Sequence, residues 1–333
     1  MGVGKGAMEG VVRHMENKDK VRGVVITGPT GAIGTALIQQ CIEQRVKVLA
    51  IVRNGSDRKS RLPQSPLLQV VECSLNGLKA LDENRLRMSG AELGRYDVFY
   101  HFAWAATIGD GRNDMQLQTE NIRYALDAVS LAFRLGCHTF IGAGSQAEYG
   151  RSDTRLSDQT PTFPENGYGM AKLCAGQMTR LECKKYGMRH IWARILSVYG
   201  PGDGEKTMIS TVIRSLLAGG RPALTKGEQM WDYLYCKDAA RAMYLLGEKG
   251  RDEAVYCIGS GQARPLREYI EILRDCIDPG LEPDFGAVPY GDKQIMYLCA
   301  DIGKLTEDTG FVPEVEFAEG IRETVAWWRG GGR

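Results

Sequence analysis

A tyrosine and a lysine in the middle of the chain have the types and the spacing of an acid–base pair. Tyr168 and Lys172 stand four residues apart in "YGMAK", so they share one face of a helix. A phenol has a pKa of about 10, and it exchanges protons near neutral pH only where a cation favours its phenolate. Lys172 can be that cation. The same spacing is common on solvated helix surfaces. The surrounding elements must therefore show whether this pair belongs to an active site.

A glycine-rich turn near the amino terminus has the pattern of a phosphate-binding loop. In "VVITGPTGAIG", an apolar strand leads directly into Gly28, Gly31 and Gly34, and a helical pattern follows. A turn without side chains lets the backbone approach a pyrophosphate, whose charge is favoured by the amino terminus of the helix. The spacing, G-x-x-G-x-x-G, departs from the general G-x-G-x-x-G pattern. The turn indicates a dinucleotide site, with a purely structural β–α turn as the alternative.

The second apolar run, "KVLAIVRN", ends at Arg53, where a site selective for NAD typically has an acidic residue. The loop that follows adds a hydroxyl and further cations: Ser56, Arg58, Lys59 and Arg61. Arginine forms bidentate, charge-assisted hydrogen bonds with phosphate, so the loop suits the 2′-phosphate of NADP(H). NADP(H) is therefore favoured over NAD(H). The alternative is a solvated basic loop, because Asp57 lies among the cations.

Short apolar runs alternate with longer amphipathic segments over the first 200 residues. This alternation predicts an α/β fold with a doubly wound, Rossmann-type parallel sheet, whose ligands lie at the carboxyl ends of the strands. The expected strands are Gly23–Thr27, Lys47–Val52, Leu68–Val71, Val98–Phe102, Thr139–Gly142 and Ile191–Leu196. The expected helices between them are Gly31–Gln44, Gln116–Leu135 and Tyr168–Tyr186.

The alternation of apolar runs and amphipathic segments becomes less regular after about residue 200. There we expect a strand near Val255–Ile258 and helices at Met208–Leu217, Leu266–Cys276 and Ala318–Trp328. This predicts a flexible extension over residues 1–20 and a dinucleotide-binding domain over 21–200 that also receives part of 230–262. A smaller C-terminal substrate-binding lobe is expected over 201–330.

Composition excludes several classes of protein. The chain has 42 Lys and Arg against 41 Asp and Glu, a net charge of +1, so no overall field favours nucleic acid or an anionic membrane. The four histidines and nine cysteines form no zinc-type cluster, and no apolar run reaches the roughly 20 residues of a membrane span. We expect no metal, no nucleic-acid partner, no membrane span, and reduced thiols in the cytoplasm.

Together these features resemble the extended branch of the short-chain dehydrogenase/reductase superfamily, the NAD(P)-dependent sugar-nucleotide epimerases, dehydratases and reductases. The resemblance runs from about Val21 to Trp328. Besides the glycine turn, "GSQAEYG" (144–150) and "PTFPENGYGMAK" (161–172), it rests on "HFAWAA" (101–106), Asn121, "ARILSVYGPGD" (193–203), "WDYLYCKDAARA" (231–242) and "ADIGKLTEDTGFVP" (300–313).

The resemblance implies a role for each matching residue. Tyr168 would exchange a proton with a sugar hydroxyl or ketone, Lys172 would hold the nicotinamide ribose and lower the tyrosine pKa, and Ser145 would hydrogen-bond the reacting oxygen. Hydride would pass between the nicotinamide and the sugar carbon. A homodimer is implied, built from the helices at 116–135 and 168–186. The implied cofactor-binding residues are Gly28, Thr30, Gly31, Ala32, Ile33, Gly34, Arg53, Arg58, Ser74, Leu75, Phe102, Ala103, Tyr168, Lys172, Ile195 and Val198.

Absent groups narrow the reaction that the resemblance implies. Family members that dehydrate across C5–C6 have an Asp-Glu pair directly after the hydroxyl residue, and this chain has Gln146 and Ala147 there. An amide and a methyl cannot transfer these protons. Members of the GDP-fucose synthase type use a cysteine and a histidine at the positions of Ala147 and Gly202. Reduction of a 4-keto-(6-deoxy)hexose by NADPH and 4-epimerisation with retained NAD remain, and the basic loop favours reduction.

The substrate is expected to be a nucleotide sugar, but its contacts are less determined. Where sugar-nucleotide epimerases usually carry a diphosphate-binding arginine, this chain has Trp231, and a second arginine expected near Gly291 is absent. Two other functions therefore stay open: reduction of a non-sugar ketone or aldehyde, and non-catalytic dinucleotide binding. His101 is expected to pack at a strand end. The residues expected to contact the substrate are Trp104, Gln146, Trp231 and Lys293.

Overall fold

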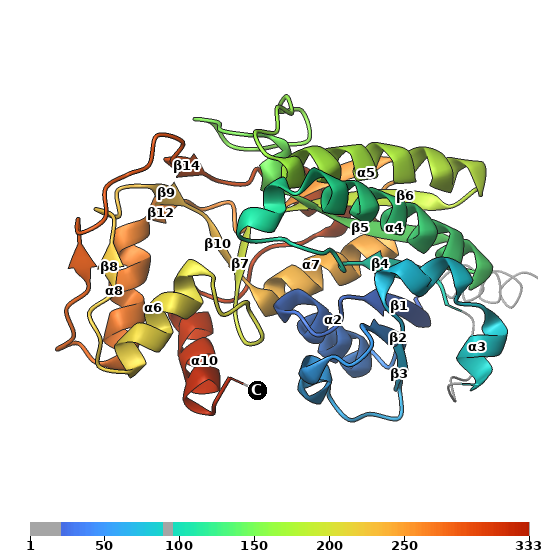
Figure 1. Cartoon of the computed structure of the whole chain (residues 1–333), viewed down its shortest axis with the longest axis horizontal. Coiled ribbons are helices and arrows are strands. Elements are labelled where there is room, and N and C mark those ends of the chain that lie inside the picture. Colours follow the sequence, from blue (N-terminus) through green and yellow to red (C-terminus); the bar gives the residue numbers. More distant parts are fainter. Residues whose placement is uncertain (1–20, 89–95, 333) are drawn as a thin grey trace, which may run out of the picture.

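A parallel sheet of seven strands forms the centre of the molecule (Figure 1). The structure is a computed structural model that describes residues 21–88 and 96–332; the extension expected over 1–20 lies outside them. The strands follow the order β11-β6-β5-β4-β1-β2-β3, and every neighbouring pair is parallel. The predicted doubly wound, Rossmann-type fold is confirmed. The strands are β1 Gly23–Thr27, β2 Lys47–Val52, β3 Leu68–Glu72, β4 Val98–His101, β5 Thr139–Ser145, β6 Arg189–Ile195 and β11 Ala254–Ile258.

Helices cover both faces of this sheet (Figure 1). α2 packs against α7 on one face, and α4 packs against α5 on the other. Alternate residues of β1 belong to the two cores: Val24 lies with the residues of α2, and Val25 lies with those of α4. Because both faces are buried, these strands are continuous apolar runs. The helices are α2 Ala32–Glu43, α4 Met115–Arg134, α5 Gly167–Lys185 and α7 Cys236–Lys249.

Three glycines make room for one tryptophan beneath α5. A Cβ at Gly142 would lie 2.2 Å from the indole of Trp192 on β6, and a Cβ at Gly144 would lie 2.4 Å from it. Gly176 of α5 packs on the same ring, where a Cβ would lie 2.7 Å away. These distances are too short for real contacts, so only glycine lets α5, β5 and the indole approach this closely. The packing fixes α5 against the end of β5, where Ser145 stands.

The chain after residue 200 builds a second group of elements beside the sheet, at the left of Figure 1. α7 and β11 leave this group and return to the central sheet. The division into a dinucleotide-binding domain and a smaller lobe stays our prediction. The short strands are β7 Ser197–Tyr199, β8 Ala223–Leu224, β9 Met230–Trp231, β10 Tyr233–Tyr235, β12 Arg264–Pro265, β13 Asp284–Phe285 and β14 Tyr297–Leu298; the helices are α6 Met208–Leu217, α8 Leu266–Ile277, α9 Gly303–Thr309 and α10 Phe317–Arg329.

The observed bounds differ from the expected ones at one point that matters to the site. β5 runs to Ser145 rather than ending at Gly142, so the serine is the last residue of a buried strand. Short helical turns connect the main elements: η1 Asp57–Arg61, η2 Leu75–Ala80, α3 Glu83–Met88, η3 Asp110–Asn113 and η4 Gln146–Glu148. In residues 21–88 and 96–332, no helix is long and apolar enough to cross a bilayer.

Candidate active site

Two cavities lie at the carboxyl ends of the central strands, and Gly28 and Trp104 belong to the walls of both. The larger cavity has a volume of about 640 Å³ and reaches the ends of β1 and β2 and the start of η2. The smaller cavity, of about 300 Å³, lies between the starts of α2 and α5 and the end of β5. Every expected cofactor residue lines one of them: the larger has Gly28, Thr30, Arg53, Arg58, Ser74, Leu75 and Ala103, and the smaller has Gly28, Gly31, Ala32, Ile33, Gly34, Phe102, Tyr168, Lys172, Ile195 and Val198.

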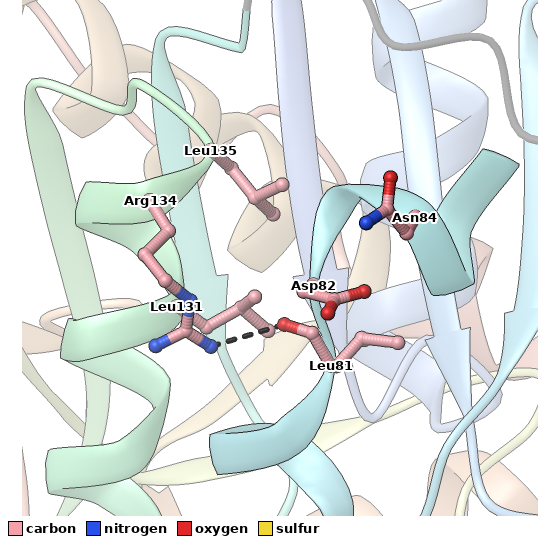
Figure 2. A pocket seen from close by; sticks show the side chains of 6 residues that line it. All are labelled: Leu81, Asp82, Asn84, Leu131, Arg134 and Leu135. Carbon is pink, nitrogen blue, oxygen red and sulfur yellow. Dashed lines mark hydrogen bonds between the residues drawn. The ribbon is translucent and has the colours of Figure 1, made fainter.

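A third cavity, of about 360 Å³, lies between the C-terminal end of α4 and the segment from Leu81 to Asn84 (Figure 2). The guanidinium of Arg134 donates to the carbonyl oxygen of Leu81 at 3.0 Å, as Figure 2 shows, and to that of Leu78 at 3.2 Å. Its charge is therefore used to hold η2 against α4. We assign this cavity a packing role and no chemistry.

The glycine turn has the geometry that a dinucleotide needs. Gly28 has a φ of +69°, and a Cβ on it would lie 2.8 Å from the backbone nitrogen of Ala103. A Cβ on Gly34 would lie 2.5 Å from the carbonyl oxygen of Gly28, so both glycines are required by the protein itself. α2 begins at Gly31 without a side-chain cap and without an acidic residue in its first turn. Its first amide groups are thus left for a phosphate ligand, and the residues present fit a dinucleotide.

The loop after β2 presents only part of its positive charge to the larger cavity. Arg53, Ser56, Asp57 and Arg58 line it. Lys59 instead forms an ion pair with Glu72 at 2.9 Å. The guanidinium of Arg61 is also committed elsewhere, because it donates to the carbonyl oxygen of Gly202 and stacks over Trp327. Two arginines and one hydroxyl are therefore available to a ligand at this end.

Ser145 and Tyr168 meet in the smaller cavity. Asn166 caps α5 by accepting from the amide of Gly169 at 2.9 Å, which starts the helix at the tyrosine. Ser145 and Tyr168 both line this cavity. Burial raises the pKa of Tyr168 above its ordinary value of 10, while the nearby hydroxyl of Ser145 and the charge of Arg112 lower it. The phenol is therefore protonated at neutral pH and placed to donate its proton.

Lys172 is buried directly behind this pair, with 3% of its surface exposed. Its Nζ atom donates to the carbonyl oxygen of Ala143 at 2.7 Å and lies 3.8 Å from the ring centroid of Trp104. The ring centroid of Tyr168 is 5.7 Å away. Burial lowers the pKa of Lys172 from 10.5 to about 7, against the attraction of Glu148. The lysine thus gains or loses its charge near neutral pH.

A buried carboxylate holds the backbone of Ser145 in place. Glu148 is fully buried, and it accepts from the amide of Ser145 at 2.8 Å and from the indole of Trp192 at 3.0 Å. The guanidinium of Arg194, also buried, donates to it at 2.7 Å. The carboxylate is paired with a guanidinium and accepts further hydrogen bonds, which offsets the cost of burying it. It ties the end of β5 to β6 and fixes the backbone that carries the Ser145 hydroxyl.

Trp104, expected at the substrate, forms part of the wall that both cavities share. Its indole donates to Gln118 at 2.9 Å and meets the ring of Tyr168 edge-on, with 6.3 Å between the centroids. Asn121 holds the same loop through two hydrogen bonds of 3.0 Å to the backbone of Ala105. The family-type "HFAWAA" segment and Asn121 therefore build one rigid wall.

The structure brings the other expected substrate residues to neither of these two cavities. Trp231 packs between two core clusters and donates from its indole to the hydroxyl of Ser197 at 2.8 Å, so a packing role accounts for its position. Gln146 is partly buried in η4, and Lys293 is exposed. Their contacts with substrate stay predictions. His101 is buried at the end of β4, where burial lowers its pKa to about 3.

Two residues that sequence reasoning missed lie at the site. The guanidinium of Arg112, on η3, lies 4.6 Å from the ring centroid of Tyr168. Asp203 lines the smaller cavity and accepts from Gly204 and Thr207 at 2.7 Å each. Burial raises the pKa of Asp203 to about 6. The acid after "YGPG" could have been noticed as part of a family motif, whereas Arg112 stands in a short irregular loop that has no pattern.

Known proteins resemble this chain over nearly its whole length. It is 23% identical over 306 residues to CDP-abequose synthase of Salmonella typhimurium, covering 90% of this chain and 96% of that protein. It is 25% identical over 313 residues to dTDP-4-dehydro-6-deoxyglucose reductase of Escherichia coli, covering 91% and 96%.

A solved structure with the same fold is the UDP-N-acetylglucosamine 4-epimerase of Methanobrevibacter ruminantium M1, determined with UDP-N-acetylmuramic acid. The match has a TM-score of 0.82 at 23% identity and covers 94% of this chain and 99% of that one. Residues 24–259, most of the chain, match the model of the NAD dependent epimerase/dehydratase family. With the glycine turn and the Ser145, Tyr168 and Lys172 site in place, the chain belongs to this family and is an enzyme of the extended short-chain dehydrogenase/reductase type.

Proposed function

We propose that the enzyme reduces the 4-keto group of a nucleotide-activated (6-deoxy)hexose at the expense of NADPH. The observation that carries the proposal is that the two cavities are neighbours, with Gly28 and Trp104 in the walls of both. An acid–base site stands in the smaller cavity, and a loop with free arginines lines the larger cavity, which shares its wall. One dinucleotide can span both.

The larger cavity supports NADPH as the cofactor. Arg53 and Arg58 form no ion pair with any residue in the described part of the chain, and Ser56 stands between them. A 2′-phosphate on the adenosine ribose would complete these three groups, because guanidinium and hydroxyl donors suit phosphate oxygens. Two solved structures of the same fold, DesIV and WbmG, contain NAD, which supports a nicotinamide dinucleotide in general. A reductase that draws on the NADPH pool needs this preference, whereas an epimerase that retains its cofactor does not.

The smaller cavity supplies the groups that a ketone reduction needs. Bound NADPH supplies the hydride. Tyr168 gives its phenolic proton to the ketone oxygen, so the sugar gains one hydride and one proton and becomes an alcohol. Ser145 donates a hydrogen bond to the same oxygen, and Glu148 keeps the serine in place. Lys172, when protonated, stabilises the phenolate that remains.

The residues that follow Ser145 support a reaction at one carbon. The residues after Ser145 are Gln146 and a buried Ala147, so an elimination has no acid and base there. The titratable side chains that line the smaller cavity are Tyr168, Lys172 and Asp203. Proton transfer by one tyrosine, coupled to hydride transfer, is the chemistry that this set supports.

The test is a turnover assay with the full chain and 4-keto-6-deoxyhexoses carried on dTDP, CDP, UDP and GDP. With at least one of them, we expect NADPH to be oxidised, and faster than NADH is. The absorbance of the reduced nicotinamide measures both rates. Interconversion of two nucleotide sugars without net absorbance change, by an enzyme isolated with bound NAD, would establish a 4-epimerase instead. Turnover only with simple ketones or aldehydes would establish the non-sugar reductase, and no turnover with any of them would favour a non-catalytic binding protein.

We also propose that the enzyme forms a homodimer. α4 and α5 expose apolar side chains of Phe133, Met178 and Leu181, which are 49%, 42% and 59% accessible. A homodimer that packs these helices against their copies would cover them, and a monomer in sedimentation at micromolar concentration would refute it. We also propose a cytoplasmic location, where thiols stay reduced.

A further inference from the structure

Arg112 lies over the face of the catalytic tyrosine. Its guanidinium carbon is 4.6 Å from the ring centroid of Tyr168, nearer than the Nζ atom of Lys172 at 5.7 Å. A cation at this distance over an aromatic face is attracted by the ring, and it also lowers the electrostatic potential energy of a phenolate. Arg112 therefore lies where its positive charge lowers the pKa of the phenol.

The loop that carries Arg112 is fixed against α5. The side-chain oxygen of Asn113 accepts from the amide of Gly167 at 3.0 Å, directly before the tyrosine. Gln118 donates to the carbonyl oxygens of Gly111 at 2.9 Å and Ala106 at 3.2 Å. A Cβ at Gly167 would lie 2.9 Å from the carbonyl oxygen of Arg112, so the two segments are in close contact. The backbone on both sides of Arg112 is therefore held beside the start of α5.

The charge of Arg112 is not used elsewhere in the described part of the chain. It forms no ion pair there, and its one hydrogen bond is a long one, 3.4 Å, to the carbonyl oxygen of Thr107. Arg123, by contrast, stacks over Tyr124 and is also paired with Glu120. The charge of Arg112 is consequently free to act on the tyrosine.

No other group around Tyr168 in the described part of the chain provides a permanent positive charge that would stabilise its phenolate. The carboxylate of Glu148, which is paired with Arg194, raises the pKa of Tyr168, and Ser145 is uncharged. Lys172 donates to a carbonyl oxygen and loses its charge near neutral pH, since its pKa is about 7. An arginine stays protonated at any pH that the protein experiences. The side chains that face Tyr168 are Trp104 from the loop after β4, Arg112 from η3, Ser145 from β5, Glu148 from η4 and Lys172 from α5.

We propose that Arg112 is a second cation of the site, a positioning residue that holds the ring of Tyr168 and stabilises its phenolate when Lys172 is neutral. The inference rests on the proposed role of Tyr168 as the proton donor. It assigns to the pair of Lys172 and Arg112 the work that the sequence assigned to the lysine alone. Through Tyr168, Arg112 sets the pH range over which proton transfer occurs.

The test replaces Tyr168 by 3-fluorotyrosine, whose single fluorine signal reports the ionisation of that one phenol by NMR. In the Arg112→Gln variant we expect the titration to move to higher pH, and in Arg112→Lys to stay nearer that of the parent. The matched control is Arg123→Gln, which removes an arginine from the face of Tyr124 and should leave the signal at position 168 unchanged. Thermal unfolding of each variant checks that the fold is kept.

Equal titrations of the parent and the Arg112→Gln variant would overturn the inference, as would an equal displacement by Arg112→Lys and Arg112→Gln. The titration needs no substrate, so its failure is distinct from a failure of the proposed reduction in the turnover assay. Where turnover is found, Arg112→Gln should move the alkaline limb of the kcat profile to higher pH. A rate loss that is the same at every pH would indicate a merely structural role.

Discussion

The two neighbouring cavities differ in how their positive charges are exposed. In the larger cavity, Arg53 and Arg58 are exposed on a loop at the end of a strand. In the smaller cavity, Lys172 is 3% exposed, and burial lowers its pKa to about 7. Water and salt screen an exposed cation, so it attracts a phosphate and otherwise does little to the protein. A buried cation costs free energy to bury, and its charge is screened less than that of an exposed cation.

The difference shows that charge placement separates recognition from chemistry in this molecule. Removing an exposed arginine should alter which cofactor binds and leave stability and proton transfer alone. Removing a buried charge should alter rate, pH dependence and stability together. Two of the changes at buried charges below, Lys172→Met and Glu148→Gln, therefore have an exposed counterpart.

The largest effect is expected from Lys172→Met. Loss of the ammonium should lower turnover by roughly 10²–10⁴-fold, the usual contribution of an acid–base group. The folded pKa of Lys172 lies below its ordinary value of 10.5, so the parent enzyme should gain stability as the pH rises from about 7 toward 10.5. Lys172→Met should lack this gain. Chemical unfolding at several pH values measures it.

The matched change at the exposed end is Arg58→Met. We expect its stability to stay within about 0.5 kcal/mol of the parent at every pH, as for an ordinary surface site. Parallel pH–stability curves for the parent and Lys172→Met would contradict the account of a charge that is costly to bury.

The next largest effect is expected from Glu148→Gln. This change leaves the buried guanidinium of Arg194 without its carboxylate, which typically costs about 3–5 kcal/mol of stability. The matched control is Glu165→Gln, which breaks an exposed pair with Arg151 and should cost much less stability, because solvent screens this pair. Urea unfolding compares the two. Equal losses would mean that burial does not distinguish these ion pairs.

Substitutions in the glycine turn should have a smaller effect on stability, and Gly31→Ala is the control for Gly34→Ala. Gly34→Ala places a Cβ 2.5 Å from the carbonyl oxygen of Gly28. We expect it to cost about 1–3 kcal/mol of stability through overpacking and to weaken dinucleotide binding. Gly31→Ala meets only that oxygen, at 3.8 Å, so it should keep its stability and lose dinucleotide affinity. Calorimetric binding and thermal unfolding separate these outcomes, and unchanged affinity in Gly31→Ala would place the diphosphate elsewhere.

The smallest effect is expected from Arg53→Ser and Arg58→Ser. Each should weaken NADPH binding by about tenfold, because one charge-assisted hydrogen bond contributes roughly 1.5 kcal/mol. NADH lacks the 2′-phosphate, so its affinity should not change. Equal losses for both cofactors, or a parent enzyme that binds NADH tightly and NADPH negligibly, would overturn the assignment of this end to a phosphate and favour the epimerase.

The local parts of this site could be predicted from the sequence. The glycine turn, the strand before it and the helix after it are neighbours along the chain, so a short pattern contains them. The pair of Tyr168 and Lys172 shares one helix face for the same reason. Both also match a family pattern, from which we predicted the cofactor-binding residues, and the predicted residues line the two cavities.

The remaining parts depend on contacts between distant segments. Lys59 and Arg61 belong to the same basic loop as Arg58, and only the packing against Glu72 and Gly202 removes them from the cavity. The roles of Gly142 and Gly176 become visible only when Trp192 is placed between them. Arg112 reaches Tyr168 from another loop, which no periodicity indicates.

The most direct test of the central claim follows the hydride and the proton donor in one experiment. The parent enzyme and Tyr168→Phe are given NADPH deuterated at the transferred position, together with the 4-keto-6-deoxyhexose nucleotide that the assay identifies. The account predicts a product alcohol with deuterium on C4 from the parent, and binding of NADPH without product from Tyr168→Phe. Full deuterium transfer by the Tyr168→Phe variant would contradict it.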